Sequence, residues 1–148
     1  MESGIFDCPE MWERLLPEDT RRLRNPAELP DKSWDLLALT QSGCQRLGQQ
    51  EIRCRTLLVP GDCPPALLAR LHAETVISYG LSPRDSLTLS SLTEPVLCVQ
   101  RTLLRPDGAP VEPQEFPLPE LPGPAVELLP VLGLRLLQMP LTAAQRLW

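Results

Sequence analysis

Lysine, histidine and aromatic residues are scarce in this chain. Among its 148 residues there is one lysine, Lys32, and one histidine, His72, and aromatic residues make up 4%. Arginine therefore carries nearly all of the positive charge, and the net charge at pH 7 is −5. A protein that binds nucleic acid needs a basic surface, so we expect no nucleic-acid partner. The many arginines and the 18 prolines are typical of a GC-rich coding genome, and we expect a bacterial source.

Metal-site spacing and long apolar runs are also missing. None of the five cysteines forms a Cys-x-x-Cys pair, and no His-x-x-x-His accompanies them, so we expect no metal and no cofactor. No run approaches the roughly 18 apolar residues that span a bilayer, so we expect no membrane association. The N-terminal residues lack the basic-then-apolar pattern of a signal peptide. We therefore expect a cytoplasmic protein whose thiols are free and act mostly as small buried hydrophobes.

The apolar pattern predicts an α/β fold. Short apolar runs at 34–41 and 51–62 have the character of buried strands, residues 64–73 have helical spacing, and 74–80 is again rich in β-formers. A strand–helix–strand unit of this length favours parallel pairing with a right-handed crossover. Downstream, three extended runs predict an antiparallel meander, with the turn Arg105-Pro106-Asp107-Gly108 between the last two; the runs are 85–92, 95–104 and 109–118. The expected fold is a small, mostly parallel sheet flanked by helices, with an antiparallel β-meander extension.

The same pattern predicts the domain organisation. Residues 1–33 are polar and broken by prolines, and we expect an N-terminal arm laid on a single domain at 34–148. Within that domain we expect the core and first meander strands at 34–104, the return strand of a hairpin at 105–118 and a helical segment at 125–148.

The C-terminal helical segment carries more apolar residues than one sheet face needs. Pro130, Gly133 and Pro140 are expected to break or kink it. Leu134 and Met139 fall off its main apolar stripe. We therefore expect a second apolar surface there and a homo-oligomer formed through it.

One stretch carries a family resemblance. Residues 56–92, TLLVPGDCPPALLARLHAETVISYGLSPRDSLTLSSL, resemble the C-terminal half of the central, ATP-binding domain of Mur ligases and the related folylpolyglutamate synthetases. The matching features are the turn at 59–64 and the strand at 76–81, and Leu39-Thr40-Gln41 looks like the family's strand that ends in Thr-Asn. The order of elements matches over about residues 34–118.

The departures from that family concern its ATP chemistry. A phosphate loop needs glycines before its lysine, whereas Pro26 and Asp31 stand at those positions ahead of Lys32. The family's magnesium-binding histidine is missing, and 42–46 reads Ser-Gly-Cys-Gln-Arg. The resemblance therefore implies a reduced core without ATP-driven ligation.

The resemblance also implies a ligand site. In Mur ligases the acidic turn lies near the base and ribose of the nucleotide, and Asp62 occupies that turn here. We take Asp62, Tyr79 and Gly80 as candidate ligand-binding residues and assign no catalytic residue. An aspartate just before Pro64-Pro65 is more typical of a helix N-cap, and that alternative stays open.

The expected function is a non-catalytic interaction or ligand-binding module derived from a Mur-ligase-like core. One alternative is a small enzyme in which His72 activates Cys44 or Cys63, or in which carboxylates act in pairs, Asp85 with Asp107 or Glu112 with Glu115. For His72 we expect instead a position at a helix end, where it faces the helix dipole. Another alternative is a nucleotide-binding protein without ligase activity.

Overall fold

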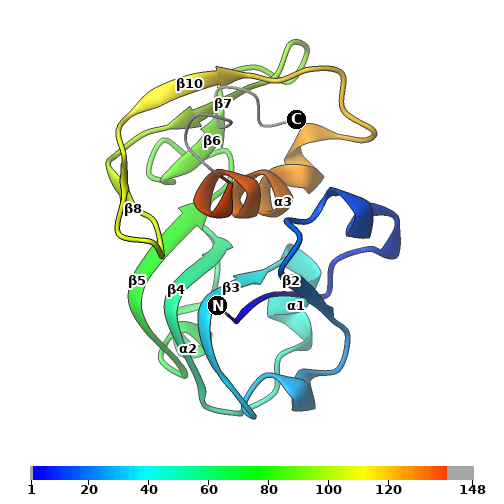
Figure 1. Ribbon diagram of the computed structural model, residues 1–148, viewed down its shortest axis with the longest axis vertical. Coiled ribbons are helices and arrows are strands. Elements are labelled where there is room, and N and C mark those ends of the chain that lie inside the picture. Colours follow the sequence, from blue (N-terminus) through cyan, green and yellow to red (C-terminus); the bar gives the residue numbers. More distant parts are fainter. Residues whose placement is uncertain (1, 140–148) are drawn as a thin grey trace.

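The computed structural model describes residues 2–139, and these form one eight-stranded sheet with a small two-stranded sheet beside it (Figure 1). Along the chain the elements are β1 (Ser3–Phe6), the 3-10 helix η1 (Glu10–Leu15), β2 (Thr20–Leu23), the 3-10 helix η2 (Pro26–Glu28), β3 (Ser33–Leu39), α1 (Gln41–Arg46), β4 (Ile52–Pro60), α2 (Pro65–Leu68), β5 (Leu71–Tyr79), β6 (Leu87–Leu89), β7 (Val96–Val99), β8 (Leu103–Leu104), β9 (Pro110–Val111), β10 (Gln114–Pro117) and α3 (Ala125–Gln138). The expected α/β class is confirmed.

The main sheet has the strand order β10-β7-β6-β5-β4-β3-β1-β2. Every pair from β2 to β6 is parallel, whereas β6–β7 and β7–β10 are antiparallel. The predicted parallel unit around α2 and the antiparallel meander are therefore both present. The meander differs in one respect: residues 95–104 supply β7 and then β8, and β8 pairs with β9 in the small sheet.

The expectation of an N-terminal arm at 1–33 is wrong. β1 lies inside the sheet, paired in parallel with both β2 and β3. Its residues Ile5 and Phe6 are fully buried. A four-residue strand is too short to show an alternating pattern, and the prolines around it are those of the loops that connect it.

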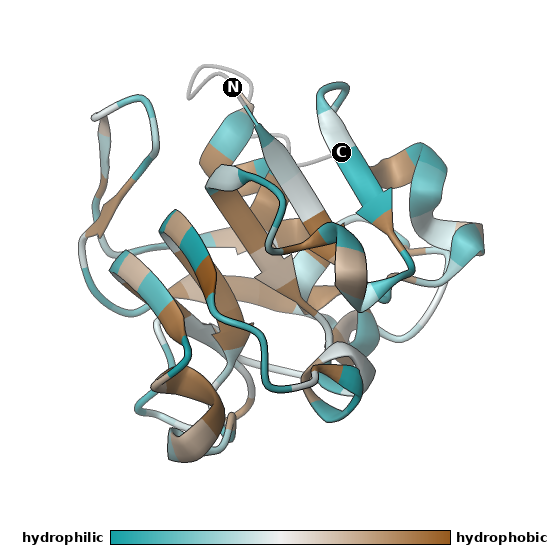
Figure 2. Cartoon of the chain, turned by 90° about the horizontal axis from the view of Figure 1, so that it is seen from below, coloured by the Kyte–Doolittle hydropathy of each residue, from teal (hydrophilic) through white to brown (hydrophobic). Residues whose placement is uncertain are grey.

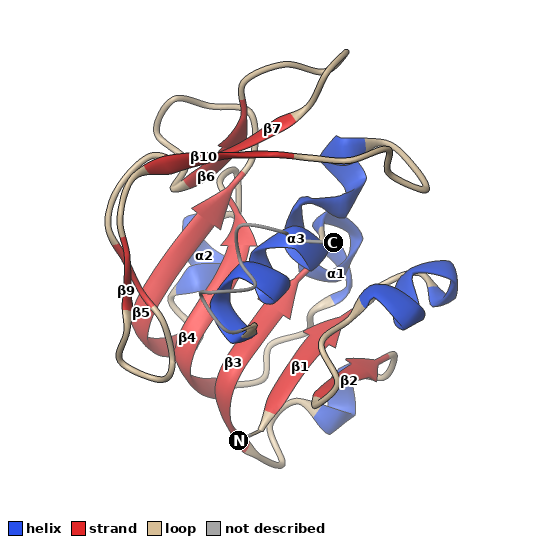
Figure 3. Cartoon of the chain, turned by 45° about the horizontal axis from the view of Figure 1, so that its top comes forward, coloured by secondary structure: helices blue, strands red, loops and turns tan. Residues whose placement is uncertain are grey.

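Helices cover both faces of the parallel sheet (Figure 3). On one face α3 and η1 bury Leu36, Leu58 and Ile77. On the other, α1 and α2 pack over Leu37, Leu57 and their neighbours. β3 from Leu36 and β4 from Leu57 are apolar and buried, which is the pattern of strands covered on both faces, whereas β5 carries polar residues and is partly exposed. Figure 2 shows hydrophobic residues along the middle of the sheet and hydrophilic ones towards several strand ends.

The helix expected at 64–73 is shorter than its apolar spacing suggests. α2 ends at Leu68, and β5 already begins at Leu71. The main-chain NH of Ile52 donates to the carbonyl of Arg70, so pairing with β4 takes over at this point. His72 therefore lies in a strand and not at a helix end.

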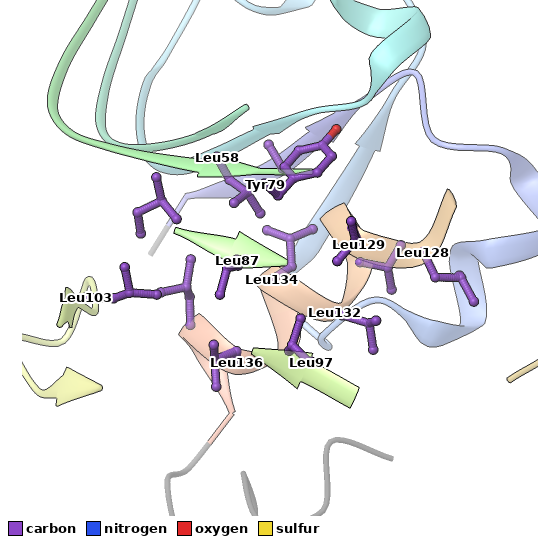
Figure 4. Close-up of a cluster of buried hydrophobic side chains, with 14 of the residues drawn as sticks. Leu58, Tyr79, Leu87, Leu97, Leu103, Leu128, Leu129, Leu132, Leu134 and Leu136 are labelled. Atoms are coloured by element: carbon purple, nitrogen blue, oxygen red, sulfur yellow. The ribbon is translucent and has the colours of Figure 1, made fainter. Parts of the chain in front are cut away.

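α3 continues unbroken through Pro130 and Gly133, where a break or a kink was expected. Leu134 has no exposed surface, and Figure 4 shows it within a cluster that includes Leu58, Leu87 and Leu97. The prediction of a second exposed apolar surface at Leu134 is therefore wrong. The helix is covered by the sheet below it and by the antiparallel extension, which bends over its other side (Figure 3). Pro140 and the rest of the segment to 148 lie outside the described residues.

Candidate functional site

A crevice of about 770 Å³ opens at the carboxyl ends of the parallel strands. Its wall comes from the segments that follow β1, β3, β4 and β5, and from the first turns of α3. The lining residues are Asp7, Pro9, Trp12, Thr40, Gln41, Ser42, Pro60, Gly61, Asp62, Tyr79, Gly80, Leu81, Ser82, Asp85, Val126, Glu127, Leu129 and Pro130.

The strand order explains why the crevice forms there. The order β2-β1-β3-β4-β5 reverses direction between β1 and β3. The connection after β1 runs on the face of α3, whereas those after β3 and β4 run on the opposite face. In doubly wound sheets the diverging connections leave a crevice at such a point, outside the carboxyl ends of the strands, and ligands bind in it.

All three candidate ligand-binding residues line this crevice. Asp62 follows β4, and Tyr79 and Gly80 stand at the end of β5. The register pairs Pro60 with Tyr79, so the two strands end side by side. The structure thus brings together the residues singled out from the sequence, and their role in binding stays a prediction.

Asp62 is not a helix N-cap. The N-cap position of α2 is Pro64, and no side chain caps this helix. Instead, Asp62 accepts hydrogen bonds from Nε2 of Gln41 at 3.0 Å and 2.9 Å, one on each carboxylate oxygen. These bonds tie the loop after β4 to the first residue of α1.

Tyr79 supports the wall with its hydroxyl group. The hydroxyl donates to the carbonyl oxygen of Leu39 at 2.7 Å, and 5% of the residue is exposed. Burial raises the pKa of Tyr79 far above its usual range. The hydroxyl is therefore neutral, and its proton is already donated to the carbonyl oxygen of Leu39. Tyr79 contributes its aromatic ring to the lining of the crevice.

Asp85 is the functional candidate that sequence reasoning missed. The sequence suggests it only as an acid–base partner of Asp107, which instead forms an ion pair with Arg105 in the β8–β9 turn. Asp85 is 4% exposed and lines the crevice, where its Oδ2 accepts from the main-chain NH of Ser82 at 3.0 Å. The polar loop Ser82-Pro83-Arg84-Asp85, directly after a buried strand, is the signal in the sequence that would have found it.

Two glycines make room for the Asp85 carboxylate. A Cβ at Gly61 would lie 1.8 Å from Oδ1 of Asp85, and one at Gly80 would lie 2.5 Å from Oδ2. Both distances are impossible for real atoms, so any side chain at either position would displace Asp85. This close approach is a physical reason for glycine at position 80.

The polar side of the crevice is acidic. Its lining contains the carboxylates of Asp7, Asp62, Asp85 and Glu127, and no lysine, arginine or histidine among the described residues. Asp7 is neutralised by an ion pair with Arg46, which stands at the end of α1. Across the described part of the chain, no ion pair reaches Asp85.

The apolar side of the crevice comes from η1 and α3. Trp12, Leu129 and Pro130 line it, and Leu81 and Val126 stand exposed at 54% and 41%. The arrangement offers an apolar surface facing a negatively charged one.

The structure does not form the Cys–His pair of the enzyme alternative. His72 pairs with Glu51 and lies opposite Arg53 at the start of β5. Tyr79, at the other end of β5, lies about 23 Å from His72 at roughly 3.3 Å per residue, and Cys44 and Cys63 lie beside that end.

Neither a metal cluster nor a membrane span is found between residues 2 and 139. No group of three or more His, Cys, Asp or Glu side chains there could hold a metal ion. No helix in this range is long and apolar enough to cross a membrane.

No protein family, curated protein or solved structure matches the chain. The resemblance to Mur ligases therefore stays a hypothesis, and the interpretation of the crevice depends on its geometry.

Proposed function

We propose that this protein is a non-catalytic binding module whose crevice holds a small organic cation, an amine carried on an apolar body. The module retains a Mur-ligase-like core without the ATP chemistry of that family. The observation that carries the proposal is Asp85, a nearly buried carboxylate in the crevice whose only hydrogen bond within the described residues comes from a main-chain NH.

The physical argument begins with the cost of burying a charge. A carboxylate removed from water is stabilised by a cationic partner that also donates hydrogen bonds. The crevice provides no such partner from the described side chains, whereas a bound ammonium group would supply one. Asp62 and Glu127 lie in the same lining and add to the negative field.

The apolar wall defines the rest of the ligand. Ligand pockets are mostly apolar, with a few polar groups that fix orientation. Here Trp12, Leu129 and Pro130 would contact the hydrocarbon part of the ligand. Anionic ligands such as nucleotides are disfavoured, because their phosphates would face carboxylates with no basic side chain in the described lining.

The five free cysteines support a reducing compartment, and we place the protein in the cytoplasm.

Isothermal titration calorimetry with matched ligand pairs tests the proposal. Each pair consists of a primary alkylamine and the alcohol of the same chain length. We expect amines to bind and the matched alcohols to bind at least tenfold more weakly, because a charge-assisted hydrogen bond contributes about 1.5–3 kcal/mol.

Asp85→Asn keeps the shape of the side chain and removes its charge. We expect it to weaken amine binding by tenfold or more, whereas Asp107→Asn, in the exposed β8–β9 turn, serves as the matched control and leaves binding unchanged. Equal affinity for amines and alcohols, or full amine binding by Asp85→Asn, would show that the charge of the crevice does not select the ligand.

A further inference from the structure

Two cysteines lie together beside the crevice. Cys44 is on α1 and Cys63 follows β4, and the thiol of Cys44 donates to the sulfur of Cys63 at 4.0 Å. A disulfide has a sulfur–sulfur distance of about 2.05 Å, so the two atoms need to approach by about 2 Å. The hydrogen bonds between Gln41 and Asp62 already hold the same two segments together.

The other three cysteines have no such partner. Cys8 donates to the carbonyl of Pro9, Cys98 contacts the carbonyl of Val96, and Cys54 is 5% exposed. All five cysteines belong to the described residues, and Cys44–Cys63 is the only pair among them joined by a hydrogen bond.

The two thiols of the pair are not equivalent. The hydrogen bond from Cys44 stabilises a thiolate on Cys63 and lowers the pKa of Cys63, against the opposing effects of burial and of Asp62. The pKa of Cys44 is raised, first by that same hydrogen bond and then by burial. Cys63 is 8% exposed and its thiolate accepts the hydrogen bond from Cys44, so we assign the first attack to Cys63 and the resolving step to the more exposed Cys44.

We propose that Cys44 and Cys63 form a reversible dithiol–disulfide site that exchanges with low-molecular-weight disulfides, and that the disulfide fastens α1 to the segment that carries Asp62. This proposal goes beyond amine binding and does not depend on it.

The exchange proceeds in two steps that balance. The thiolate of Cys63 attacks one sulfur of a small disulfide RSSR, forms a mixed disulfide and releases RS⁻, which takes up a proton. Cys44 then loses its proton to solvent and attacks the sulfur of Cys63, which expels the second RS⁻. In total the protein loses two electrons to RSSR and two protons through solvent, and two RSH are formed.

The consequence lies at the crevice wall. Gln41 is three residues before Cys44, and Asp62 directly precedes Cys63, and both line the crevice. The disulfide adds a covalent connection where the reduced protein has hydrogen bonds and apolar packing.

The test uses the full chain and oxidised glutathione as the disulfide. The folded protein is incubated with it, denatured without reductant and alkylated. We expect the number of labelled thiols to fall from the five of the reduced protein to three. Trypsin cleaves after Lys32, Arg46, Arg55 and Arg70, so the cross-link should join peptide 33–46 to peptide 56–70.

Three variants distinguish the steps. Cys44→Ser should accumulate glutathione on Cys63, because no resolving thiol remains, whereas Cys63→Ser should accumulate little on Cys44. Cys98→Ser is the matched control and should form the cross-link like the natural chain. Circular dichroism before treatment establishes that each variant is folded.

Retention of five labels by the natural chain, under conditions in which Cys44→Ser takes up glutathione, would overturn the proposal. A persistent mixed disulfide on the natural chain would overturn it too, since this would mean that Cys44 cannot reach Cys63.

Discussion

The hydroxyl of Tyr79 donates to the carbonyl oxygen of Leu39 at 2.7 Å, and this bond connects the carboxyl ends of β5 and β3 across β4. Both groups are buried, so neither finds water as a substitute partner. The bond holds two walls of the crevice at a fixed separation.

Tyr79→Phe removes this bond and keeps the ring. We expect the free energy of unfolding to fall by about 1–2 kcal/mol, because the carbonyl of Leu39 loses a buried donor. Urea denaturation followed by circular dichroism measures the change. An unchanged midpoint would mean that the bond makes no net contribution to stability.

Gly61→Ala introduces a methyl group into the space that the carboxylate of Asp85 occupies. The Cβ would lie 1.8 Å from Oδ1 of Asp85, so the carboxylate has to move, and we expect a loss of about 1–3 kcal/mol. Asp85→Ala in the same chain should recover part of that loss, because it removes the clashing atoms. Gly48→Ala, whose Cβ would meet only the end of the Gln50 side chain, is the control and should change stability little.

Leu134→Ala tests the position of α3. Leu134 has no exposed surface, so its truncation should cost about 2–5 kcal/mol. Val126, at 41% exposed, provides the comparison, and Val126→Ala should cost less than about 1 kcal/mol. Comparable losses in both variants, measured by thermal unfolding, would contradict the burial of Leu134.

Self-association through the C-terminal segment stays a prediction. Leu134 cannot belong to the contact surface, because it is buried. Light scattering of the natural chain at micromolar concentration measures the mass directly. A monomer mass would exclude the homo-oligomer.

Stability should decrease in alkaline solution. Burial raises the pKa of Cys54 to about 12 and that of Cys8 to about 11, both above the ordinary thiol value. Because the folded chain holds these protons more tightly than the unfolded chain, their stabilisation is complete below about pH 9 and is lost as the pH rises further. We expect a loss of about 1 kcal/mol per buried thiol between about pH 9 and pH 10.

Cys54→Ala should flatten this pH dependence by the contribution of one thiol. The half-exposed Cys98 supplies the control, and Cys98→Ala should retain the full slope. Urea denaturation at several pH values gives both slopes, and equal slopes for the natural chain and Cys54→Ala would refute the explanation.

ATP should not be hydrolysed by the protein. Lys32 has no glycine loop before it, and its amine pairs with Glu2 at 3.4 Å and not with any group of the crevice. A coupled assay with magnesium and ATP should give the background rate for the natural chain and for Lys32→Ala alike. Turnover that Lys32→Ala abolishes would restore a phosphate-binding role for this lysine.

The sequence alone determined the elements with a strong local signal. β3 and the second half of β4 follow from short apolar runs, because a strand buried on both faces needs apolar residues throughout. β5 follows from its enrichment in β-formers, and it is only partly buried. The turn at Asp107-Gly108 and the antiparallel meander follow from turn chemistry. Placing Asp62 and Tyr79 at one edge needed only the order of elements, since parallel strands end on the same side.

The tertiary structure alone decided the remainder. β1 is a strand because β2 and β3 stand on either side to pair with it, and four residues carry no such signal by themselves. Leu134 is buried because β4 and β6, far from α3 in the sequence, place Leu58 and Leu87 against the helix (Figure 4), so helical spacing could not identify its partners. The contacts of Asp85 with Gly61 and Gly80, and of Cys44 with Cys63, bring together residues from separate loops. Their distances depend on how the strands are ordered across the sheet, which no local pattern records.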